Sequence, residues 1–509
     1  MAHTCCWLML PWVALILVTS CSTTEFIVHL MDWRFDDIAR ECDTFLSKSG
    51  YSAVLISPVH EPPEIPRMPW YERYQVYSYN ITTRSGNVTE FQNMVQRCSK
   101  AGLKVYVEVV LNHMSTNLPL VTRGLGGSVA QPFNKLYPAL SLKSEHFHST
   151  CGVVDYLNSS NVRQCELDHR HDLFQKHEHV RTKQAEFLNK LIDLGVNGFK
   201  ICNAKYMYPD DLEIIMARIN KLKSGDKPFV FSEVPLEGRR KEAVRPEEYF
   251  NLGPVTEYRF ESFMKSINLM ERESNLSAIV NYTQDLMSSN KSVVFVDLMD
   301  VRNVWDIGLR KFRVFNTFML AQPYGAYKTI LSSYWMNRRD PAPPHYENKT
   351  IKHVEFKDGY WCKDSWNCEH RDPLVSRMIQ FARIVEGTNM TNFTVHGSSD
   401  YTQISFCRPG KGFVAISDIG YSTTTIKAQT CLPPGRYCNL ALGSYVNKAG
   451  KRACAFTEIK VAKDGTAMVT FSPQEDGIVA LHIKEMANNG GSTIISTISA
   501  VMVYLTVHL

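Results

Sequence analysis

The chain has little net charge for its length, and no stretch of it is dominated by one residue type. Its 509 residues include 56 Lys and Arg against 51 Asp and Glu, which gives a formal net charge of +5. So small an excess argues against nucleic-acid binding and against electrostatic attachment to a membrane. No internal repeat is visible. With 44% hydrophobic residues, the chain is suited to two or three globular domains, or to one large barrel with attachments.

Long apolar runs are also missing, and the two short ones lie at the ends of the chain. Residues 7–18 form an apolar core of signal-peptide length followed by small residues, which predicts a signal peptide over residues 1–22. Residues 494–509 are apolar and uncharged but too short to span a bilayer comfortably. We therefore expect the chain to enter the secretory pathway.

The C-terminal run follows a cluster of small residues at 488–492. Small residues before a hydrophobic tail are typical of a glycosylphosphatidylinositol (GPI) anchor signal, here residues 486–509, with Asn488 or Asn489 as the attachment residue. The polar spacer is shorter than usual, and a plain hydrophobic C-terminal helix is the alternative. We expect the mature chain on the extracellular face of the plasma membrane, attached to the outer leaflet by the anchor, or else secreted.

Glycosylation sequons and cysteines support the same compartment. Nine Asn-x-Ser/Thr sequons occur, at Asn80, Asn87, Asn158, Asn275, Asn281, Asn290, Asn348, Asn389 and Asn392. Three of the fourteen cysteines lie in or near the signal segment. The remaining eleven suit an oxidising compartment, and their odd number leaves at least one outside a disulfide. The run ending at Cys21 also resembles a bacterial lipoprotein signal, but the sequons and the C-terminal tail argue against that interpretation.

Strands and helices alternate along most of the chain, which predicts an α/β fold. Short apolar runs end at polar residues and are separated by segments of helical periodicity. The expected strands are residues 26–30, 53–56, 104–111, 198–206, 228–234, 255–260, 292–300 and 329–334. Eight strand–helix units indicate a (β/α)₈ TIM barrel, whose active site lies at the carboxyl ends of the strands.

The alternation is interrupted once and then stops. A Gly-, Pro-, Ser- and Asn-rich excursion follows the third strand, and from about residue 397 only strands and turns remain. The sequence therefore predicts an inserted loop-rich domain after the third strand and a C-terminal antiparallel β domain. The expected domains are a first barrel part at 23–114, the inserted domain at 115–171, a second barrel part at 172–396 and the β domain at 397–485.

One strand end carries several reactive side chains. Residues 198–206 read GFKICNAKY, a short buried strand between two helices. In a parallel barrel the carboxyl end of such a strand faces the working cleft, so Lys200, Cys202, Lys205 and Tyr206 are candidates for chemistry.

This stretch resembles the fourth-strand signature of secreted animal α-amylases (glycoside hydrolase family 13), which reads GFRIDASKH. Further blocks match the same family in order and spacing: VHLMDWRFDDIARECDTFL, WYERYQVYSYNITTRSGN, VYVEVVLNHM, FSEV, FVDLMD, QPYG, SSY, CKDSWNCEHR and GRYC. The resemblance covers nearly all of residues 26–483. It implies the barrel, the inserted domain and the C-terminal β domain. It also implies the disulfides Cys42–Cys98, Cys151–Cys165, Cys362–Cys368 and Cys438–Cys454. Cys407 and Cys431 are extra cysteines that could pair with each other, which would leave Cys202 outside the disulfides.

The resemblance also assigns catalytic roles, and one of them is altered. A retaining glycosidase uses two carboxylates, an acid/base and a nucleophile. Glu233 matches the family's acid/base, and Asp300 matches a third carboxylate that stabilises the transition state. Cys202 stands where the family has the nucleophilic Asp. Attack by a thiolate would give a thioglycoside, whose C–S bond is poorly activated by acid catalysis. We therefore expect Cys202 to be a small buried hydrophobe and the protein to be catalytically impaired.

Other family positions have changed as well. Tyr206 and Met299 replace two sugar-binding histidines, and the glycine-rich loop after the third carboxylate is missing. The family's chloride site uses two Arg and one Asn, where this sequence has Lys200, Lys328 and Leu298. Because a lysine lacks the bidentate fork of Arg, we do not expect chloride to be held as it is in the family.

Some family features persist. Asn112, Arg163 and Asp172, with the backbone carbonyl of Tyr206, match the calcium site, and oxygen ligands of this kind suit a hard cation. A buried Asn or Asp that is only hydrogen-bonded is the alternative. The positions that match sugar contacts are Trp70, Tyr71, Tyr74, Gln75, His113, Lys205, Tyr206 and Met299.

Three functions remain open at this stage. The first is an amylase-like pseudoenzyme of the cell surface that binds α-1,4-glucan, malto-oligosaccharide or a protein partner without cleavage. The second is an active α-amylase that uses Glu233 and Asp300 with an unusual replacement of the nucleophile. The third is an interaction protein like the amylase-related heavy chains of amino-acid transporters. That third function requires a retained N-terminal membrane helix, whereas the N-terminal run here is short and signal-like.

Overall fold

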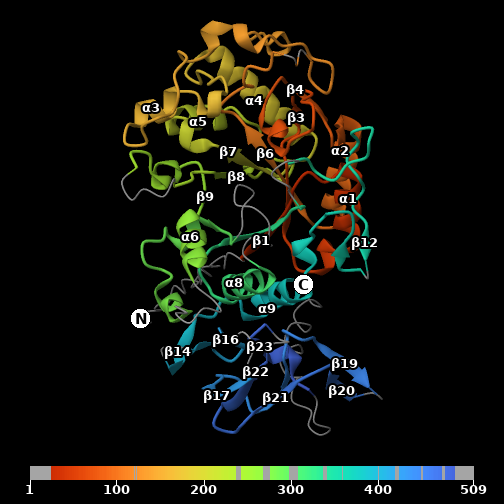
Figure 1. Cartoon of the computed structure of the whole chain (residues 1–509), viewed down its shortest axis with the longest axis vertical. Coiled ribbons are helices and arrows are strands. Elements are labelled where there is room, and N and C mark those ends of the chain that lie inside the picture. Colours follow the sequence, from red (N-terminus) through yellow and green to blue (C-terminus); the bar gives the residue numbers. More distant parts are fainter. Residues whose placement is uncertain are drawn as a thin grey trace, which may run out of the picture.

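The computed structural model describes most of the chain, which forms a barrel, an excursion from the barrel and a C-terminal β domain (Figure 1). The described residues are 24–119, 121, 123–236, 242–267, 276–296, 308–335, 341–357, 359–398, 401–418, 423–448, 451–472 and 476–487. The predicted signal peptide and anchor attachment residues lie outside them. So do three positions expected at the site, Leu298, Met299 and Asp300.

Eight parallel strands close into a barrel, which confirms the predicted fold. In order round the barrel they are β1 (Glu25–Leu30), β11 (Tyr327–Ser332), β10 (Ser292–Val294), β9 (Val255–Thr256), β8 (Phe229–Ser232), β7 (Gly198–Cys202), β6 (Lys104–Val110) and β2 (Ala53–Ile56). Every neighbouring pair is parallel. The carboxyl ends of all eight strands therefore meet at one end of the barrel.

Side chains alternate between the inside and the outside of the barrel along each strand. Those that point inward form a small apolar cluster of their own, which includes Ile27, Leu55, Tyr106, Phe231 and Val293. Their sequence neighbours point outward and join the large core beneath the helices. The direction in which a strand residue points is therefore fixed by its place in this alternation.

Helices surround the barrel and lie in the described residues at α1 (Phe35–Thr44), α2 (Val88–Lys100), α4 (Glu178–Asp193), α5 (Pro209–Met216), α6 (Tyr258–Ser266), α8 (Leu309–Ala321) and α9 (Pro373–Val385). Two predicted strands are too long. Residues 198–206 form a strand only as far as Cys202, and the short helix η7 (Ala204–Tyr206) follows. Residues 255–260 are wrong over their last four residues. The strand ends at Thr256, and α6 begins at Tyr258 because the Glu257 side chain caps the helix by accepting the Arg259 N–H at 3.1 Å.

The excursion after β6 has little regular structure and lies at the end of the molecule opposite the C-terminal sheets (Figure 1). It contains the short helix α3 (Ser159–Gln164) and the Cys151–Cys165 disulfide. A small sheet from the β2–α2 connection lies near it, with strands β3 (His60–Glu61), β4 (Ser78–Thr83) and β5 (Gly86–Asn87). The Glu61 carboxylate accepts hydrogen bonds from Gly126 and Ser128 and so ties the two excursions together.

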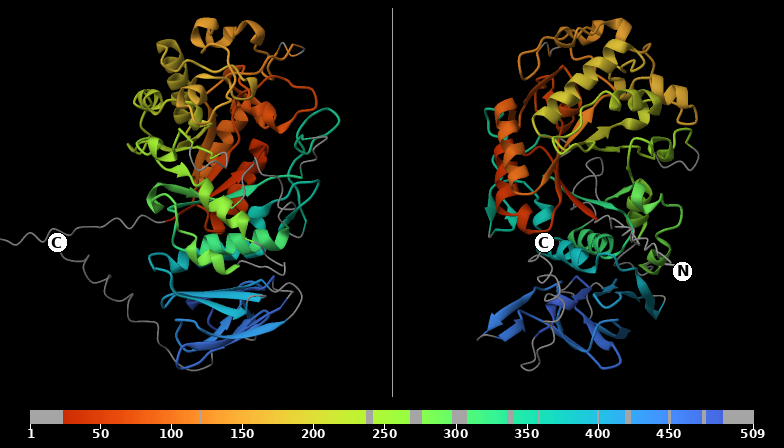
Figure 2. Two further views of the ribbon diagram at one scale, coloured as in Figure 1. Left: turned by 60° about the vertical axis from the view of Figure 1, so that its left-hand side comes forward. Right: turned by 180° about the vertical axis from the view of Figure 1, so that it is seen from behind.

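The C-terminal domain consists of antiparallel sheets packed around a second core (Figure 2). One sheet has the order β14 (Thr391–Ser398), β15 (Tyr401–Arg408), β16 (Gly412–Ser417), β23 (Ile478–His482). The other has the order β17 (Thr424–Gln429), β22 (Thr466–Phe471), β21 (Glu458–Val461), β18 (Gly435–Cys438). In the same domain β19 (Tyr445–Lys448) pairs with β20 (Lys451–Cys454). Outside this domain, between β11 and α9, β12 (Phe356–Lys357) pairs with β13 (Trp361–Cys362).

Five disulfides are formed among the described cysteines. They are the four pairs implied by the resemblance, Cys42–Cys98, Cys151–Cys165, Cys362–Cys368 and Cys438–Cys454, together with Cys407–Cys431. Cys202 lies outside them and is buried.

Candidate functional site

Two of the predicted catalytic positions lie side by side at the carboxyl end of the barrel. Cys202 is the last residue of β7, and Glu233 directly follows β8. The two strands are paired in register, with Ile201 opposite Ser232, and the Glu233 N–H donates to the Ile201 carbonyl at 3.0 Å. The fold thus brings the thiol and the acid/base position to adjacent strand ends.

The buried Lys200 on β7 forms ion pairs with one carboxylate on β6 and with another directly after β8. The Lys200 ammonium lies 2.8 Å from Glu108 Oε1 and 2.6 Å from Glu233 Oε1. Glu108, on β6, also accepts the Tyr74 hydroxyl at 2.6 Å and lies 3.5 Å from His29 Nε2. One cation is therefore shared between two carboxylates inside the barrel.

Glu108 and Lys200 hold each other in their ionised forms. Burial alone would raise the pKa of Glu108, but Lys200 and His29 outweigh it and hold that pKa well below its usual range. Burial alone would lower the pKa of Lys200, but Glu108 and Glu233 outweigh it and raise that pKa well above its usual range. Lys200 is thus a permanent ammonium at physiological pH.

Glu233 accepts hydrogen bonds at both carboxylate oxygens. Its Oε1 faces Lys200, and its Oε2 accepts the Asn203 N–H at 3.1 Å. Asn203 can present its N–H there because it adopts a left-handed conformation, φ 54°. A general acid must carry a proton to the leaving group, whereas this arrangement uses both oxygens as acceptors.

Cys202 itself is almost completely enclosed, with 1% of its surface exposed. It lies close enough to Lys200 and Tyr74 to raise the pKa of both. Lys200, which it influences, is already bound to two carboxylates. Asp300 lies outside the described residues, so the third carboxylate of the resemblance stays a prediction.

The predicted sugar-contacting residues divide into exposed and buried ones. Trp70 and Tyr71 begin the short helix η2 (Trp70–Tyr74), with ring centroids 5.9 Å apart, and Tyr71 is 41% exposed. Gln75 and His113 are buried: Gln75 accepts hydrogen bonds from Thr116, and His113 Nε2 lies 2.9 Å from the Tyr74 carbonyl. Burial lowers the pKa of His113 well below its usual value, so the ring is neutral.

Lys205 and Tyr206 contact other parts of the chain. The Lys205 ammonium is fully buried, lies 2.6 Å from Glu242 Oε2 and stands 4.6 Å above the Tyr156 ring. The Tyr206 hydroxyl is 3.4 Å from that of Tyr156. Both residues therefore fasten the inserted segment to the barrel, and Trp70 and Tyr71 are the expected sugar contacts best placed to stack on a ring from solvent.

Sequence reasoning missed the residues that complete the charge network. Glu108 is the main omission, and its signal is visible: it is the one acidic residue inside the apolar strand KVYVEVV. A second buried pair lies close by, with Arg73 Nε 2.6 Å from Asp32 Oδ1 and the Tyr334 hydroxyl 2.9 Å from Asp32 Oδ2.

Comparisons of the sequence with known proteins identify the family of the chain. Residues 42–136 match the α-amylase catalytic domain, and residues 395–484 match the α-amylase C-terminal all-β domain. The α-amylase-related protein of Drosophila willistoni is 37% identical over 471 residues, which cover 90% of this chain and 93% of that protein. The α-amylase-related protein of Drosophila kikkawai is also 37% identical, over 473 residues with the same coverage. The chain belongs to the α-amylase family.

Solved structures of α-amylases have the same fold. The crystal structure of α-amylase I from Eisenia fetida superposes with a TM-score of 0.81 at 29% identity, covering 90% of this chain and 97% of that chain. A variant of the same enzyme in complex with maltohexaose gives the same TM-score, identity and coverage.

Two residues at the family's calcium position fit a cation. Asn112 Oδ1 and Asp172 Oδ1 are buried, and neither has a hydrogen-bond partner among the described residues. The two residues lie next to each other, because the Leu173 N–H donates to the Asn112 carbonyl at 2.9 Å. Buried acceptor oxygens are normally satisfied, and a hard cation between these two would satisfy both.

The other two predicted calcium residues could contribute only backbone oxygens. The Arg163 guanidinium carries donors alone and binds Glu248 Oε2 at 2.7 Å and the Tyr249 hydroxyl at 3.3 Å. Tyr206 lies buried in the short helix η7 (Ala204–Tyr206). Asn112, Asp172 and these carbonyls would hold calcium between the inserted segment and the barrel.

The calcium assignment predicts a pH-dependent response to chelation. Burial raises the pKa of Asp172 to about 7. In metal-free protein the stability gained by protonating this carboxyl is complete below its ordinary pKa of about 4 and is lost as the pH rises through about 7. We therefore expect the Tm of EDTA-treated protein to fall between about pH 4 and pH 7, and added calcium to restore more at the higher pH. Asp172→Asn should abolish both responses. An unchanged Tm with EDTA at the higher pH would refute the assignment.

The structure shows where two of the three residues at the doubtful chloride position, Lys328 and Lys200, point. Lys328 follows the inward-facing Tyr327 on β11 and therefore points out of the barrel, where its ammonium donates to the Met319 and Gln322 carbonyls at 2.7 Å each. Lys200 points into the barrel, where its ammonium forms ion pairs with Glu108 and Glu233. The two lysines cannot share an anion, and Leu298 lies outside the described residues.

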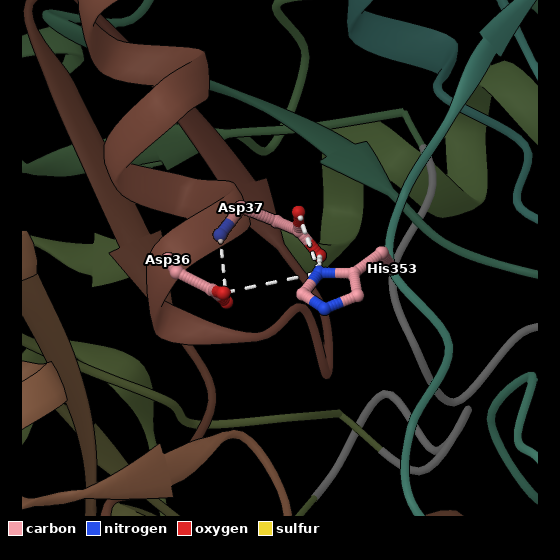
Figure 3. Close-up of side chains that lie close together, drawn as sticks. All are labelled: Asp36, Asp37 and His353. Atoms are coloured by element: carbon pink, nitrogen blue, oxygen red, sulfur yellow. Dashed lines mark hydrogen bonds and ion pairs between the residues drawn. The ribbon is translucent and has the colours of Figure 1, made fainter.

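Another group of possible metal ligands has a structural role (Figure 3). Asp36 and Asp37 on α1 lie close to His353 in the segment between β11 and β12. His353 Nδ1 is 3.2 Å from both Asp37 oxygens, which also accept from Arg40 at 2.8 Å and from the Val354 N–H at 3.0 Å. Donors already occupy the Asp37 carboxylate, so the group fastens this segment to α1.

Proposed function

We propose that this protein is an amylase-like glycoprotein of the cell surface that binds α-1,4-linked malto-oligosaccharide and does not cleave it. The observation that carries the proposal is the pair of adjacent strand ends. One presents the Cys202 thiol where the family has a carboxylate, and the other presents Glu233 already bound to Lys200.

Both halves of a retaining mechanism are affected. The first step needs a carboxylate that attacks the anomeric carbon and leaves again as a stable anion. A thiolate at Cys202 would form a C–S bond that the acid/base cannot activate through oxygen. The same step needs a protonated Glu233, whose carboxylate is here bound to an ammonium and an N–H. Neither the Cys202 thiol nor the bound Glu233 carboxylate favours cleavage of the glycosidic bond.

The binding part of the proposal rests on the aromatic residues and on a relative. Trp70 and Tyr71 offer partly exposed rings near the carboxyl end of the barrel, and flat sugar faces stack on such rings. A relative at 29% identity has been solved in complex with maltohexaose. A protein partner at the same face is the alternative.

Calorimetric titration with maltohexaose tests the binding proposal. We expect saturable binding by the wild-type protein and about a tenfold loss for Trp70→Ala, because one stacking ring is removed. Trp361→Ala is the matched control, since Trp361 lies on β13 and is 41% exposed. Equal losses in both variants, or no binding by the wild-type protein, would contradict the proposal and favour a protein partner.

The cell-surface location is supported by the sequence and by exposure. Eight of the nine sequon asparagines lie among the described residues and all eight are exposed: Asn80, Asn87, Asn158, Asn281, Asn290, Asn348, Asn389 and Asn392. Among the residues that the structure describes, no helix is long and apolar enough to cross a membrane.

Treatment of expressing cells with a phosphatidylinositol-specific phospholipase C tests the anchor. We expect the protein to move into the medium, because cleavage removes the lipid. Asn488→Leu/Asn489→Leu should reduce the phospholipase-released surface pool. Protein that stays on the cells after treatment would argue against the anchor, and protein found in the medium without treatment would indicate secretion.

A further inference from the structure

A polar cavity lies at the opposite end of the barrel from Cys202 and Glu233. Its volume is about 230 Å³, and its lining includes Thr24, Gln322, Lys328, Glu386, Asn389 and Arg408. It is formed where β1 and β11 begin and where α8 and α9 end. Both helices lie between the barrel and the C-terminal domain (Figures 1 and 2).

Lys328 reaches this cavity because of the strand alternation described above. It is 2% exposed, and its ammonium donates to two carbonyls at the end of α8, those of Met319 and Gln322. Within the described part of the chain it forms no ion pair with a carboxylate. These carbonyls at the C-terminal end of α8 bring the partial negative charge of the helix dipole but no full counter-charge.

Arg408 enters from the C-terminal domain at the end of β15 and is 4% exposed. Its guanidinium donates to the Ala321 carbonyl, to the Val385 carbonyl at 3.2 Å, and to Thr388 O and Oγ1 at 2.6 Å and 3.1 Å. Among the described carboxylates none forms an ion pair with it. The cavity thus places two buried cations, from two domains, at one wall.

Burial disfavours the charged form of both side chains, and Arg408 further disfavours that of Lys328. Burial lowers the pKa of Lys328 well below its usual value, and the charge of Arg408 lowers it further, while Glu386 partly offsets both effects. Burial also lowers the pKa of Arg408, to about 10. Glu386 accepts the Thr24 N–H, and with it the lining contains two basic side chains and one acidic side chain.

We propose that this cavity binds a small molecule bearing one carboxylate or phosphate group, with the oxyanion beside Lys328 and Arg408. Buried charges are usually compensated by a counter-charge, and a single negative charge would make the lining neutral. Water occupies about 30 Å³ in the liquid, so the cavity has room for several waters or for one small organic anion. The proposal is independent of the sugar-binding function, because it concerns the other end of the barrel.

Calorimetric titration of the purified protein with inorganic phosphate and with acetate tests the proposal. Lys328→Met removes one charge, and we expect about a tenfold or larger loss of affinity for whichever anion binds. Lys328→Arg should retain binding because it keeps the charge. Lys352→Met is the control, since Lys352 lies 5.7 Å from the Tyr346 ring in another segment and should bind like the wild-type protein.

A second variant covers the case in which Lys328→Met does not fold. Ala382 on α9 also lines the cavity, and Ala382→Leu fills space while it leaves both cations in place. We expect this variant to lose binding as well. Binding unchanged in Ala382→Leu, no binding of either anion by the wild-type protein, or equal competition by chloride at matched ionic strength would overturn the proposal.

Discussion

We expect the purified protein to release reducing ends from starch or maltohexaose at least about 10⁴-fold more slowly than a working retaining enzyme. Removal of the nucleophile lowers kcat by at least that factor in other enzymes that form a covalent intermediate. The Cys202→Asp variant is the informative comparison. It restores the missing carboxylate but leaves Lys200 bound to Glu233. We expect its activity to rise above that of the wild-type protein and to remain far below that of an active enzyme. Release of maltose and maltotriose, followed by chromatography, is the measurement.

Two outcomes would contradict this expectation. Turnover by the wild-type protein that disappears in Glu233→Gln would show an active α-amylase with an unusual nucleophile, the second function left open by the sequence. Full activity in Cys202→Asp would show that the pair between Lys200 and Glu233 does not impede acid catalysis. The Glu233→Gln variant also controls for contaminating hydrolases, whose activity it cannot remove.

Loss of Lys200 is expected to destabilise the protein by about 3–5 kcal/mol, because it leaves Glu108 and Glu233 as uncompensated carboxylates in the barrel. The Lys200 side chain is 7% exposed and that of Glu108 is fully buried. Lys200→Met should therefore lower the denaturation midpoint strongly. Lys183→Met is the matched control, because Lys183 pairs at 2.8 Å with Glu186 on the exposed face of α4. We expect less than about 1 kcal/mol there.

A double-mutant cycle separates the ion pair from the loss of packing. Glu108→Gln/Lys200→Met removes both charges, so its destabilisation should be smaller than the sum of the two single changes. Additive effects would show that the two residues act independently. A Lys200→Met protein as stable as Lys183→Met would show that the buried cluster contributes no more than a surface pair.

Most of the architecture could be predicted from the sequence, because the periodicity of apolar residues reports local structure directly. The eight strands and the C-terminal sheets follow from runs such as FIVHL and AMVTFS, which have strand length and end at turn residues. The least accurate strand prediction was that of β9. This strand has only two residues, because the Glu257 side chain caps α6 and the residues that follow are helical.

The site was predicted less completely. Resemblance placed Cys202 and Glu233 at neighbouring strand ends, and the structure has them there. It could not tell that the Lys328 ammonium donates to carbonyls at the end of α8 and lies apart from Lys200. Neighbouring residues on a strand point to opposite faces of the sheet. Matching a residue to a family motif therefore does not by itself determine which side of the barrel wall its side chain reaches.

The sequence by itself determined the family, the parallel barrel and the sulfur atom at the nucleophile position, because each of these depends on residue identity and local order. Only the tertiary structure decided which charges meet. Lys200 lies on β7, Glu108 on β6 and Glu233 directly after β8, and Lys328 and Arg408 come from two different domains. Electrostatic energy depends on distance in space and on burial, and neither quantity is written in the order of residues along the chain.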